Sequence, residues 1–173
     1  MTEELKHLHI IGGGLAGTEA AWQALEAGLK VTLYEMRPKT QTEAHRTGNL
    51  AELVCSNSFK SKKPESASGL LKEEMQAFNS LIVSAAYKAE VPAGDALAVD
   101  RELFSKHVKE KLLSHENFKL VDKEITSIPS YEELKFENAA WLVATGPLTS
   151  EKLCKQLNIL SKGEESYIKT ADV

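Results

Sequence analysis

The strongest constraint on the fold is a glycine pattern that lies between an apolar run and an alanine-rich helical pattern. Gly12, Gly14 and Gly17 have the G-x-G-x-x-G spacing. Between a strand and a helix, these glycines allow a tight turn, close approach of a pyrophosphate to the backbone, and close helix–strand packing. The phosphates would lie at the N-terminus of a helix over residues 15–28, where unpaired N–H groups and the helix dipole favour an anion. The pattern predicts a dinucleotide site.

A second strand and an acidic residue complete this pattern. The helix is expected to end at Gly28, and residues 30–35 are typical of a strand. Glu35 closes that strand 23 residues after Gly12, near the spacing at which an acid accepts hydrogen bonds from a ribose. A generic βαβ unit with a surface glutamate is the alternative. The full order of strand, glycines, helix and acid favours the dinucleotide site.

Composition excludes several classes of protein. The chain has 173 residues, of which 42% are hydrophobic and 27% charged, and it is long enough for one core. No apolar run approaches the roughly 20 residues of a membrane helix, and the start is unlike a signal peptide. Cys55 and Cys154 are far apart and form neither a metal-binding spacing nor a disulfide framework. We therefore expect a cytoplasmic protein without a metal site or membrane attachment.

Charge is distributed unevenly along the chain. Residues 37–63 hold six basic and two acidic side chains, a local charge of +4 in a chain whose net charge is −4. A basic segment on an acidic protein suits a polyanion such as RNA. A solvated lysine-rich loop explains the same charge, and on charge alone it is the better interpretation.

Two helices are predicted in the middle of the chain. Residues 66–88 have the apolar spacing of one long amphipathic helix, and Pro92 and Gly94 then mark a loop that enters a short strand. Asp100 is a plausible N-cap for a helix over residues 101–115. The positions expected to be buried are Leu70, Leu71, Met75, Phe78, Leu81, Ile82 and Ala85 in the first helix, and Leu103, Phe104, His107, Val108 and Leu112 in the second.

The last predicted strands lead back towards the glycine turn. Residues 118–121 and 124–128 are typical of two strands, residues 132–138 of a charged hairpin or loop, and residues 139–144 of a buried strand. Ligands in doubly wound sheets lie beyond the carboxyl ends of strands, so the bare backbone of Ala144-Thr145-Gly146 would return to the dinucleotide. From these residues alone, an ordinary turn is an equal alternative.

Several segments point to one family. They are Ile11–Trp22; Tyr34-Glu35-Met36-Arg37-Pro38; Ala51-Glu52-Leu53-Val54-Cys55-Ser56-Asn57-Ser58 with Gly69–Met75; and Val91–Gly94, Ala96–Arg101 and Ala144–Ser150. Together they resemble the folate- and FAD-dependent tRNA (uracil-5-)-methyltransferases, the TrmFO family, over about residues 7–150. Related flavoproteins that build carboxymethylaminomethyl-uridine share the glycine turn but lack the Glu-Met-Arg-Pro and Val-Cys-Ser-Asn-Ser segments.

The resemblance implies a Rossmann-like FAD-binding fold with a doubly wound, mostly parallel sheet. It implies FAD as cofactor, methylenetetrahydrofolate as carbon donor, NAD(P)H as reductant, and tRNA as the partner that receives 5-methyluridine in its T-loop. By resemblance Glu35 contacts the ribose and Cys55 is the active-site cysteine. The remaining expected FAD-binding residues are Gly12, Gly13, Gly14, Leu15, Ala16, Gly17, Ala144, Thr145 and Gly146.

The chemistry of Cys55 agrees with this assignment. Uracil C5 is a poor nucleophile until a group adds at C6, and a thiolate suits that addition. Neighbouring bases favour a thiolate, and Lys60, Lys62 and Lys63 follow Cys55 closely. Without the family resemblance, Cys55 would be interpreted as a buried structural thiol.

The expected organisation is an FAD-binding domain over residues 1–150 and a polar tail over 151–173. Its core would comprise residues 6–36 and 98–150, with a helical and loop insertion over 37–97. Members of the family are more than twice as long, and their second functional cysteine lies in the additional part. The alternative function is therefore a truncated, catalytically incompetent FAD-binding remnant. The Val54–Ser58 segment argues against a third interpretation, a generic flavin or nicotinamide oxidoreductase.

Overall fold

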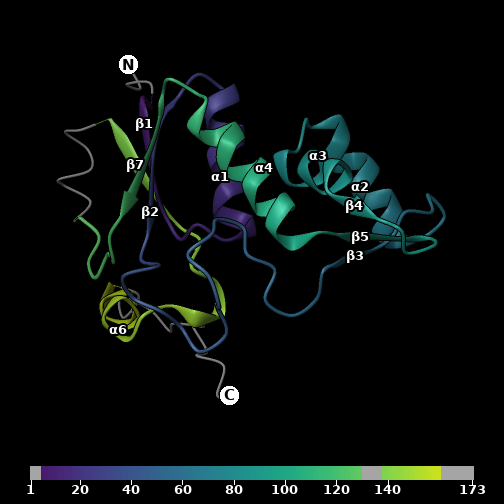
Figure 1. Ribbon diagram of the computed structural model, residues 1–173. Coiled ribbons are helices and arrows are strands. Elements are labelled where there is room, and N and C mark those ends of the chain that lie inside the picture. The colour runs from purple at the N-terminus through teal and green to yellow at the C-terminus, as the bar shows by residue number, and fades with distance from the viewer. Residues whose placement is uncertain (1–4, 130–137, 161–173) are drawn as a thin grey trace.

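A parallel sheet organises one of the two units of the fold (Figure 1). The computed structural model describes residues 5–129 and 138–160. Within them, the strands β1 (His7–Ile11), β2 (Lys30–Glu35), β6 (Phe118–Asp122) and β7 (Ala139–Val143) form a sheet of order β6-β2-β1-β7. Each neighbouring pair is parallel, with Ile11 opposite both Tyr34 and Val143. This is the strand order of a Rossmann-like unit, and it confirms the predicted fold class.

Two helices cover one face of this sheet. They are α1 (Leu15–Glu26) and α4 (Arg101–Leu113), which pack side by side in Figure 1. Asp100 caps α4, because its Oδ1 accepts a hydrogen bond from the Leu103 amide at 2.9 Å, and the predicted cap is confirmed. Of the positions predicted to be buried in α4, Phe104, Val108 and Leu112 are buried, whereas Leu103 is exposed and His107 is half-buried.

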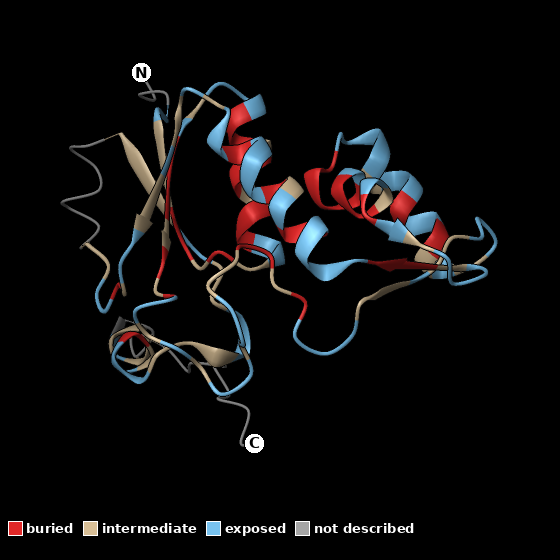
Figure 2. Ribbon diagram, in the orientation of Figure 1, coloured by how far each residue is buried: buried red, intermediate tan, exposed pale blue. Residues whose placement is uncertain are grey.

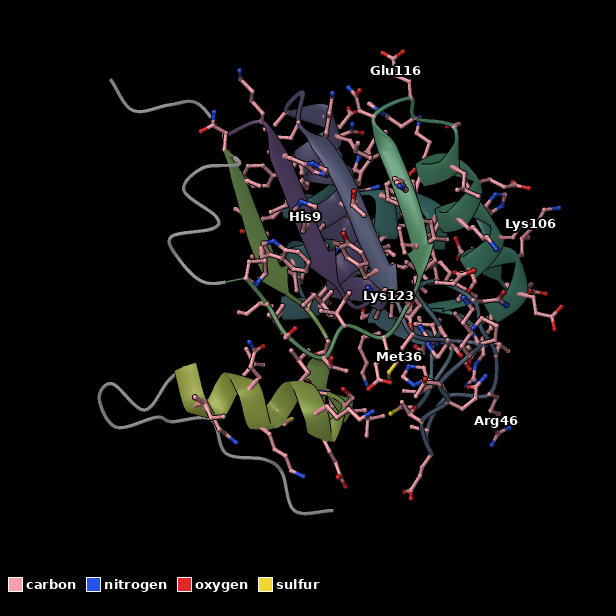
Figure 3. The ribbon with its side chains drawn as sticks, turned by 90° about the vertical axis from the view of Figure 1, so that its left-hand side faces the viewer. His9, Met36, Arg46, Lys106, Glu116 and Lys123 are labelled. Carbon is pink, nitrogen blue, oxygen red and sulfur yellow. The ribbon has the colours of Figure 1, made fainter. Side chains whose placement is uncertain are left out.

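The opposite face of the sheet carries aromatic side chains. The ring of His9 stacks on Trp141 at 4.7 Å between centroids, and Trp141 stacks on Tyr34 at 5.4 Å. Figure 3 shows His9 on this face. The two faces of the sheet therefore differ, one being covered by helices and the other by stacked rings.

A second unit lies beyond α1 and α4. It contains a sheet of order β3-β5-β4, formed by β3 (Ser58–Ser61), β4 (Glu90–Val91) and β5 (Ala96–Val99), together with helices α2 (Ala67–Ala77) and α3 (Leu81–Lys88). Both strand pairs are antiparallel. Helix α3 packs against α1 and α4, and residues of both units belong to one buried cluster. The two helices of this unit differ in burial: in Figure 2, α3 is largely buried, whereas α2 is largely exposed.

The prediction of one helix over residues 66–88 is wrong. The chain breaks at Asn79, which has a φ of +56°, and the Ser80 hydroxyl then caps α3 by accepting a hydrogen bond from the Val83 amide. Leu70, Leu71 and Phe78 are 50%, 54% and 76% exposed, and Met75 is half-buried, because the break turns α2 away from the core. Only the part of the predicted stripe that lies in α3, at Leu81, Ile82 and Ala85, is buried.

Residues 124–128 also differ from their prediction, because they form no strand. The backbone of Ile128 is instead held by a side chain: its amide donates to Gln156 Oε1 at 2.7 Å, and its carbonyl accepts from Gln156 Nε2 at 3.1 Å. Gln156 belongs to helix α6 (Glu151–Leu160). The hairpin or loop predicted at residues 132–138 lies almost wholly outside the described residues.

Strand β7 corrects one further expectation, and helix α6 lies where a polar tail was expected. Strand β7 was expected to be buried, but it lies at the edge of the described sheet, and Leu142 and Val143 are exposed. The first part of the expected tail forms helix α6, and its Leu153 is buried against Ile11 and Ile125. Helix α6 therefore lies at the carboxyl edge of the parallel sheet. No helix among the described residues has the length and apolar character needed to cross a membrane.

Candidate functional site

A cleft of about 370 Å³ lies at the carboxyl ends of β1, β2 and β7. This volume falls within the range of roughly 300–1,000 Å³ that is usual for small-molecule sites. Figure 3 shows Met36 and Lys123 below the ends of β2 and β6, on this side of the sheet. The lining residues are Ile11–Ala16, Tyr34–Arg37, Thr42, His45, Glu52, Val54, Lys123–Ile125, Ala144–Leu148, Ser150 and Leu153.

Two glycines of the turn are required by close backbone contacts. Gly12 has a φ of +105°, and a Cβ there would lie 2.6 Å from the carbonyl oxygen of Ala144. A Cβ on Gly17 would lie 1.8 Å from the carbonyl oxygen of Gly12. The Ala144 amide donates to the Ile11 carbonyl at 2.8 Å, which holds the end of β7 beside the turn. The structure thus brings Ala144, Thr145 and Gly146 to the cleft, whereas Gly17 packs beneath it.

Gly14 has a different environment, because a Cβ there would meet no atom within 4 Å. It is the N-cap of α1, its backbone is extended, and no side chain caps this helix end. The first amides of a helix have no partner within the helix, and the positive end of the dipole lies there. Leu15 and Ala16 carry two of these amides and line the cleft. Open space, amide donors and the helix dipole together fit a pyrophosphate.

Glu35 is buried at the cleft wall, and both of its oxygens accept hydrogen bonds. Oε1 accepts from the Arg37 amide and from Arg37 Nε, each at 3.0 Å. Oε2 accepts from the Gly13 amide at 2.7 Å and from Arg37 Nη2 at 3.0 Å. Burial opposes ionisation, but the hydrogen bonds and charge of Arg37, with the Gly13 amide, outweigh it and hold the pKa of Glu35 below its ordinary value. Glu35 is therefore a carboxylate at neutral pH.

Arg37 does not belong to a basic surface. Only 2% of its side chain is exposed, and it forms ion pairs of 3.0 Å with both Glu35 and Glu52. Lys62 is paired with Glu90, and Lys63 with Asp95. Three of the six bases of residues 37–63 are thus ion-paired to carboxylates, and the partners of Lys62 and Lys63 lie outside the segment. The interpretation of this segment as a polyanion-binding surface stays a prediction.

His45 is a cleft residue that the sequence did not single out. It is half-buried, and its Nδ1 lies 2.6 Å from the hydroxyl of Thr42. Burial and the charge of Arg37 lower the pKa of His45, while Glu52 and Glu35 act in the opposite direction with less effect. A single histidine in a polar loop gives no signal of this position. The sequence did give a signal for Arg37, because this residue lies two positions after Glu35, the acid of the dinucleotide fingerprint.

Cys55 lies at the margin of the cleft. Its side chain is exposed, and the preceding residue, Val54, lines the cleft. Cys55 itself is not a lining residue. Cys154 is also a free thiol and is half-buried. Over the ranges 5–129 and 138–160, no cluster of histidine, cysteine and acidic side chains could hold a metal ion.

Comparison with known proteins agrees with the resemblance seen in the motifs. The methylenetetrahydrofolate–tRNA-(uracil-5-)-methyltransferase TrmFO of Ligilactobacillus salivarius (strain UCC118) is 52% identical over 87% of this chain and 33% of its own length. The TrmFO of Lactobacillus delbrueckii subsp. bulgaricus is 52% identical over 96% of this chain and 36% of its own length. The chain thus spans about a third of the length of these curated relatives.

Two further comparisons concern structure and family. The crystal structure of the GidA-related protein from Thermus thermophilus matches with a TM-score of 0.39 and 19% identity, over 74% of this chain and 43% of that one, which is too low to assign a function. The model of the family GIDA, glucose inhibited division protein A, matches residues 7–172. This match continues beyond residue 150, where the motifs alone placed the end of the resemblance. The chain belongs to the glucose inhibited division protein A family.

Proposed function

We propose that this chain is the FAD-binding part of a folate-dependent tRNA (uracil-5-)-methyltransferase that forms 5-methyluridine in the cytoplasm. The observation that carries the proposal is the open backbone at Gly14, at the uncapped start of α1, in a chain 52% identical to curated enzymes of that name. Because this chain spans about a third of those relatives, its activity and substrates are proposed rather than transferred.

Three groups of residues would hold the cofactor. The amides at the start of α1, from Gly14 to Ala16, would bind the pyrophosphate. The ionised carboxylate of Glu35 would accept a ribose hydroxyl, and the backbone of Ala144–Gly146 would lie on the flavin side. Bound FAD would supply the hydride transfer that reduces the carbon from methylenetetrahydrofolate to a methyl group, with electrons from NAD(P)H.

Cys55 would supply the nucleophile for the base. Its thiolate would form a bond to C6 of the uracil, and the electrons of the C5–C6 double bond would make C5 nucleophilic. After C5 has accepted the carbon and lost its proton, departure of the thiolate would restore the ring. An exposed thiol beside the cleft wall at Val54 is accessible to a substrate as large as a tRNA.

The test is transfer of labelled carbon from methylenetetrahydrofolate to tRNA, with FAD and NAD(P)H present. Cys55→Ala should abolish incorporation, while Cys154→Ala, the matched control at the other free cysteine, should retain it. Equal incorporation in the wild type and in Cys55→Ala would contradict the proposed role of Cys55. Stoichiometric flavin without any incorporation would instead favour the alternative, an FAD-binding remnant without activity of its own.

A further inference from the structure

The loop that precedes Cys55 is docked directly on the glycine turn. The Ala51 amide donates to the Gly13 carbonyl at 2.8 Å, and Ala51 has a φ of +52° and is buried. The side chain of Leu50 lies so close to Gly13 that a Cβ there would be 2.5 Å from Leu50 Cδ2. Gly13 therefore lines the cleft as part of the glycine turn and also contacts the loop over residues 46–56. We call this loop the Cys55 loop.

A buried arginine provides a second link between the same two places. Arg37 joins Glu35, which holds the Gly13 amide, to Glu52, which lies three residues before Cys55. Glu52 in turn organises its own loop: Oε1 accepts from the Arg46 amide at 2.9 Å, and Oε2 accepts from the Thr47 hydroxyl at 2.9 Å and the Thr47 amide at 3.2 Å. Glu52 is thus the point at which the Cys55 loop is tied to the dinucleotide turn.

The carboxylate of Glu35 has little spare capacity for a ligand. A carboxylate offers about four acceptor positions. The Arg37 amide, two guanidinium nitrogens of Arg37 and the Gly13 amide already donate to it. A ribose hydroxyl that binds Glu35 must therefore compete with one of these donors. The guanidinium is the donor that can give way, because its Nη1 already binds Glu52 at 3.0 Å.

We propose that Arg37 and Glu52 are positioning residues that couple occupation of the dinucleotide turn to the placement of Cys55. A ribose hydroxyl at Glu35 takes the place of the guanidinium bonds to that carboxylate, so that Arg37 is left paired with Glu52 through the bond already present at 3.0 Å, and this ion pair, which holds the docked Cys55 loop, becomes stronger. Such coupling is reciprocal, so ordering of the loop also favours the ligand. The ligand half of this inference rests on the proposed FAD function, whereas the bridge itself is a property of the free protein.

The first experiment uses the free protein. A nitroxide label is attached to Cys55 in the full chain carrying Cys154→Ser. Glu52→Gln, which keeps the shape but removes the charge, should make the label more mobile and should speed exchange of the Ala51 amide about tenfold. Glu43→Gln, at an exposed position just before the Cys55 loop, is the matched control and should change neither.

A graded variant keeps this experiment decisive if Glu52→Gln does not fold, as judged by circular dichroism. Arg37→Lys keeps the positive charge but loses the planar fork that contacts both Glu35 and Glu52, so it should give a smaller change in the same direction. An unchanged label spectrum and unchanged Ala51 exchange in folded Glu52→Gln, or in Arg37→Lys if that is the only folded variant, would overturn the proposed bridge.

The second experiment adds FAD and measures its binding separately, by flavin fluorescence. FAD should reduce the mobility of the label in the wild-type background, and the response should be lost in Glu52→Gln even when FAD is bound. A merely stabilising role of Glu52 would lower the melting temperature and leave the FAD response intact, and that result would overturn the coupling. Failure of the wild type to bind FAD would overturn the proposed function and the ligand half of the coupling, while the first experiment still decides the bridge.

Discussion

The glycine turn and helix α2 are both short segments with a clear sequence pattern, yet they relate to their patterns in different ways. At the turn, Gly12 and Gly17 have no space for a Cβ, and Gly14 faces an open cleft, as the fingerprint requires. At α2, the apolar positions Leu70 and Leu71 are exposed. The helix is held instead by Gly69, where a Cβ would lie 1.8 Å from the Lys63 carbonyl, and by buried Lys72.

The difference shows what each pattern specifies. The glycine fingerprint specifies a backbone path, and the contacts that require it lie within one βαβ unit and the end of β7. An apolar stripe specifies only that a face can be buried, and the rest of the fold decides whether it is. Lys72 donates to the carbonyls of Phe59 at 2.8 Å and Ser68 at 2.6 Å. A charged residue therefore anchors α2, although the apolar pattern predicts that Leu70 and Leu71 do so.

The largest difference is expected within the turn, between Gly17 and Gly14. Gly17→Ala should lower the free energy of unfolding by about 3 kcal/mol or more, because its Cβ meets backbone that cannot move alone. Gly14→Ala should cost less than about 1 kcal/mol, since its Cβ enters open space and only the N-cap preference is affected. Urea unfolding of both variants measures the difference. Equal losses would contradict the separate roles of the two glycines.

Removal of the acid at the end of β2 should have the next largest effect. Glu35→Gln leaves the buried Arg37 with Glu52 alone and should cost about 3 kcal/mol at neutral pH. The folded-state pKa values of Glu35 and Glu52 lie below the ordinary value of 4.5, so the unfolded chain binds more protons as the pH falls. The stabilisation is complete above pH 4.5 and is lost progressively below it.

Unfolding at a series of pH values tests this expectation. The wild type should lose stability steeply below pH 4.5, Glu35→Gln should lose less, and exposed Glu43→Gln should behave like the wild type. If the free energy of unfolding falls with the same slope below pH 4.5 in the wild type and in Glu35→Gln, Glu35 is not held ionised by its partners.

The smallest effects should come from α2. Gly69→Ala should cost about 2–3 kcal/mol, because its Cβ would meet the backbone carbonyl of Lys63, which belongs to an exposed loop and must shift. Leu71→Ser should change stability by no more than about 0.5 kcal/mol, because this side chain is mostly exposed. Thermal unfolding can rank the two variants. A larger loss for Leu71→Ser would restore the predicted apolar stripe as a packing surface.

Local signals predicted much of the fold, including the turn, strands β1 and β2, and the Asp100 cap of α4. The break before α3 also had a local signal, because Asn79 tolerates a positive φ and Ser80 is a good N-cap, but the apolar spacing concealed it. Other features depend on distant partners. The chain around Ile128 is held by Gln156, and the Cys55 loop by Arg37, and neither pairing is visible in a periodicity.

The candidate site divides in the same way. The glycines, Glu35 and Ala144–Gly146 were predicted because a spacing or a strand end marks them, and apart from Gly17 they line one cleft in the structure. His45 and Glu52 line the same cleft without any such mark. Their positions follow from the way the loop after β2 folds back on the turn, through the Ala51–Gly13 hydrogen bond.

We infer that the glycine turn is an FAD site. The direct test is a titration of the full 173-residue chain with FAD. Flavin fluorescence should saturate near one FAD per chain. Gly14→Val, which fills the open space beside α1 at an extended backbone position, should greatly weaken binding while the chain remains folded. Absence of saturable binding by the wild type, or unchanged affinity in folded Gly14→Val, would contradict the claim.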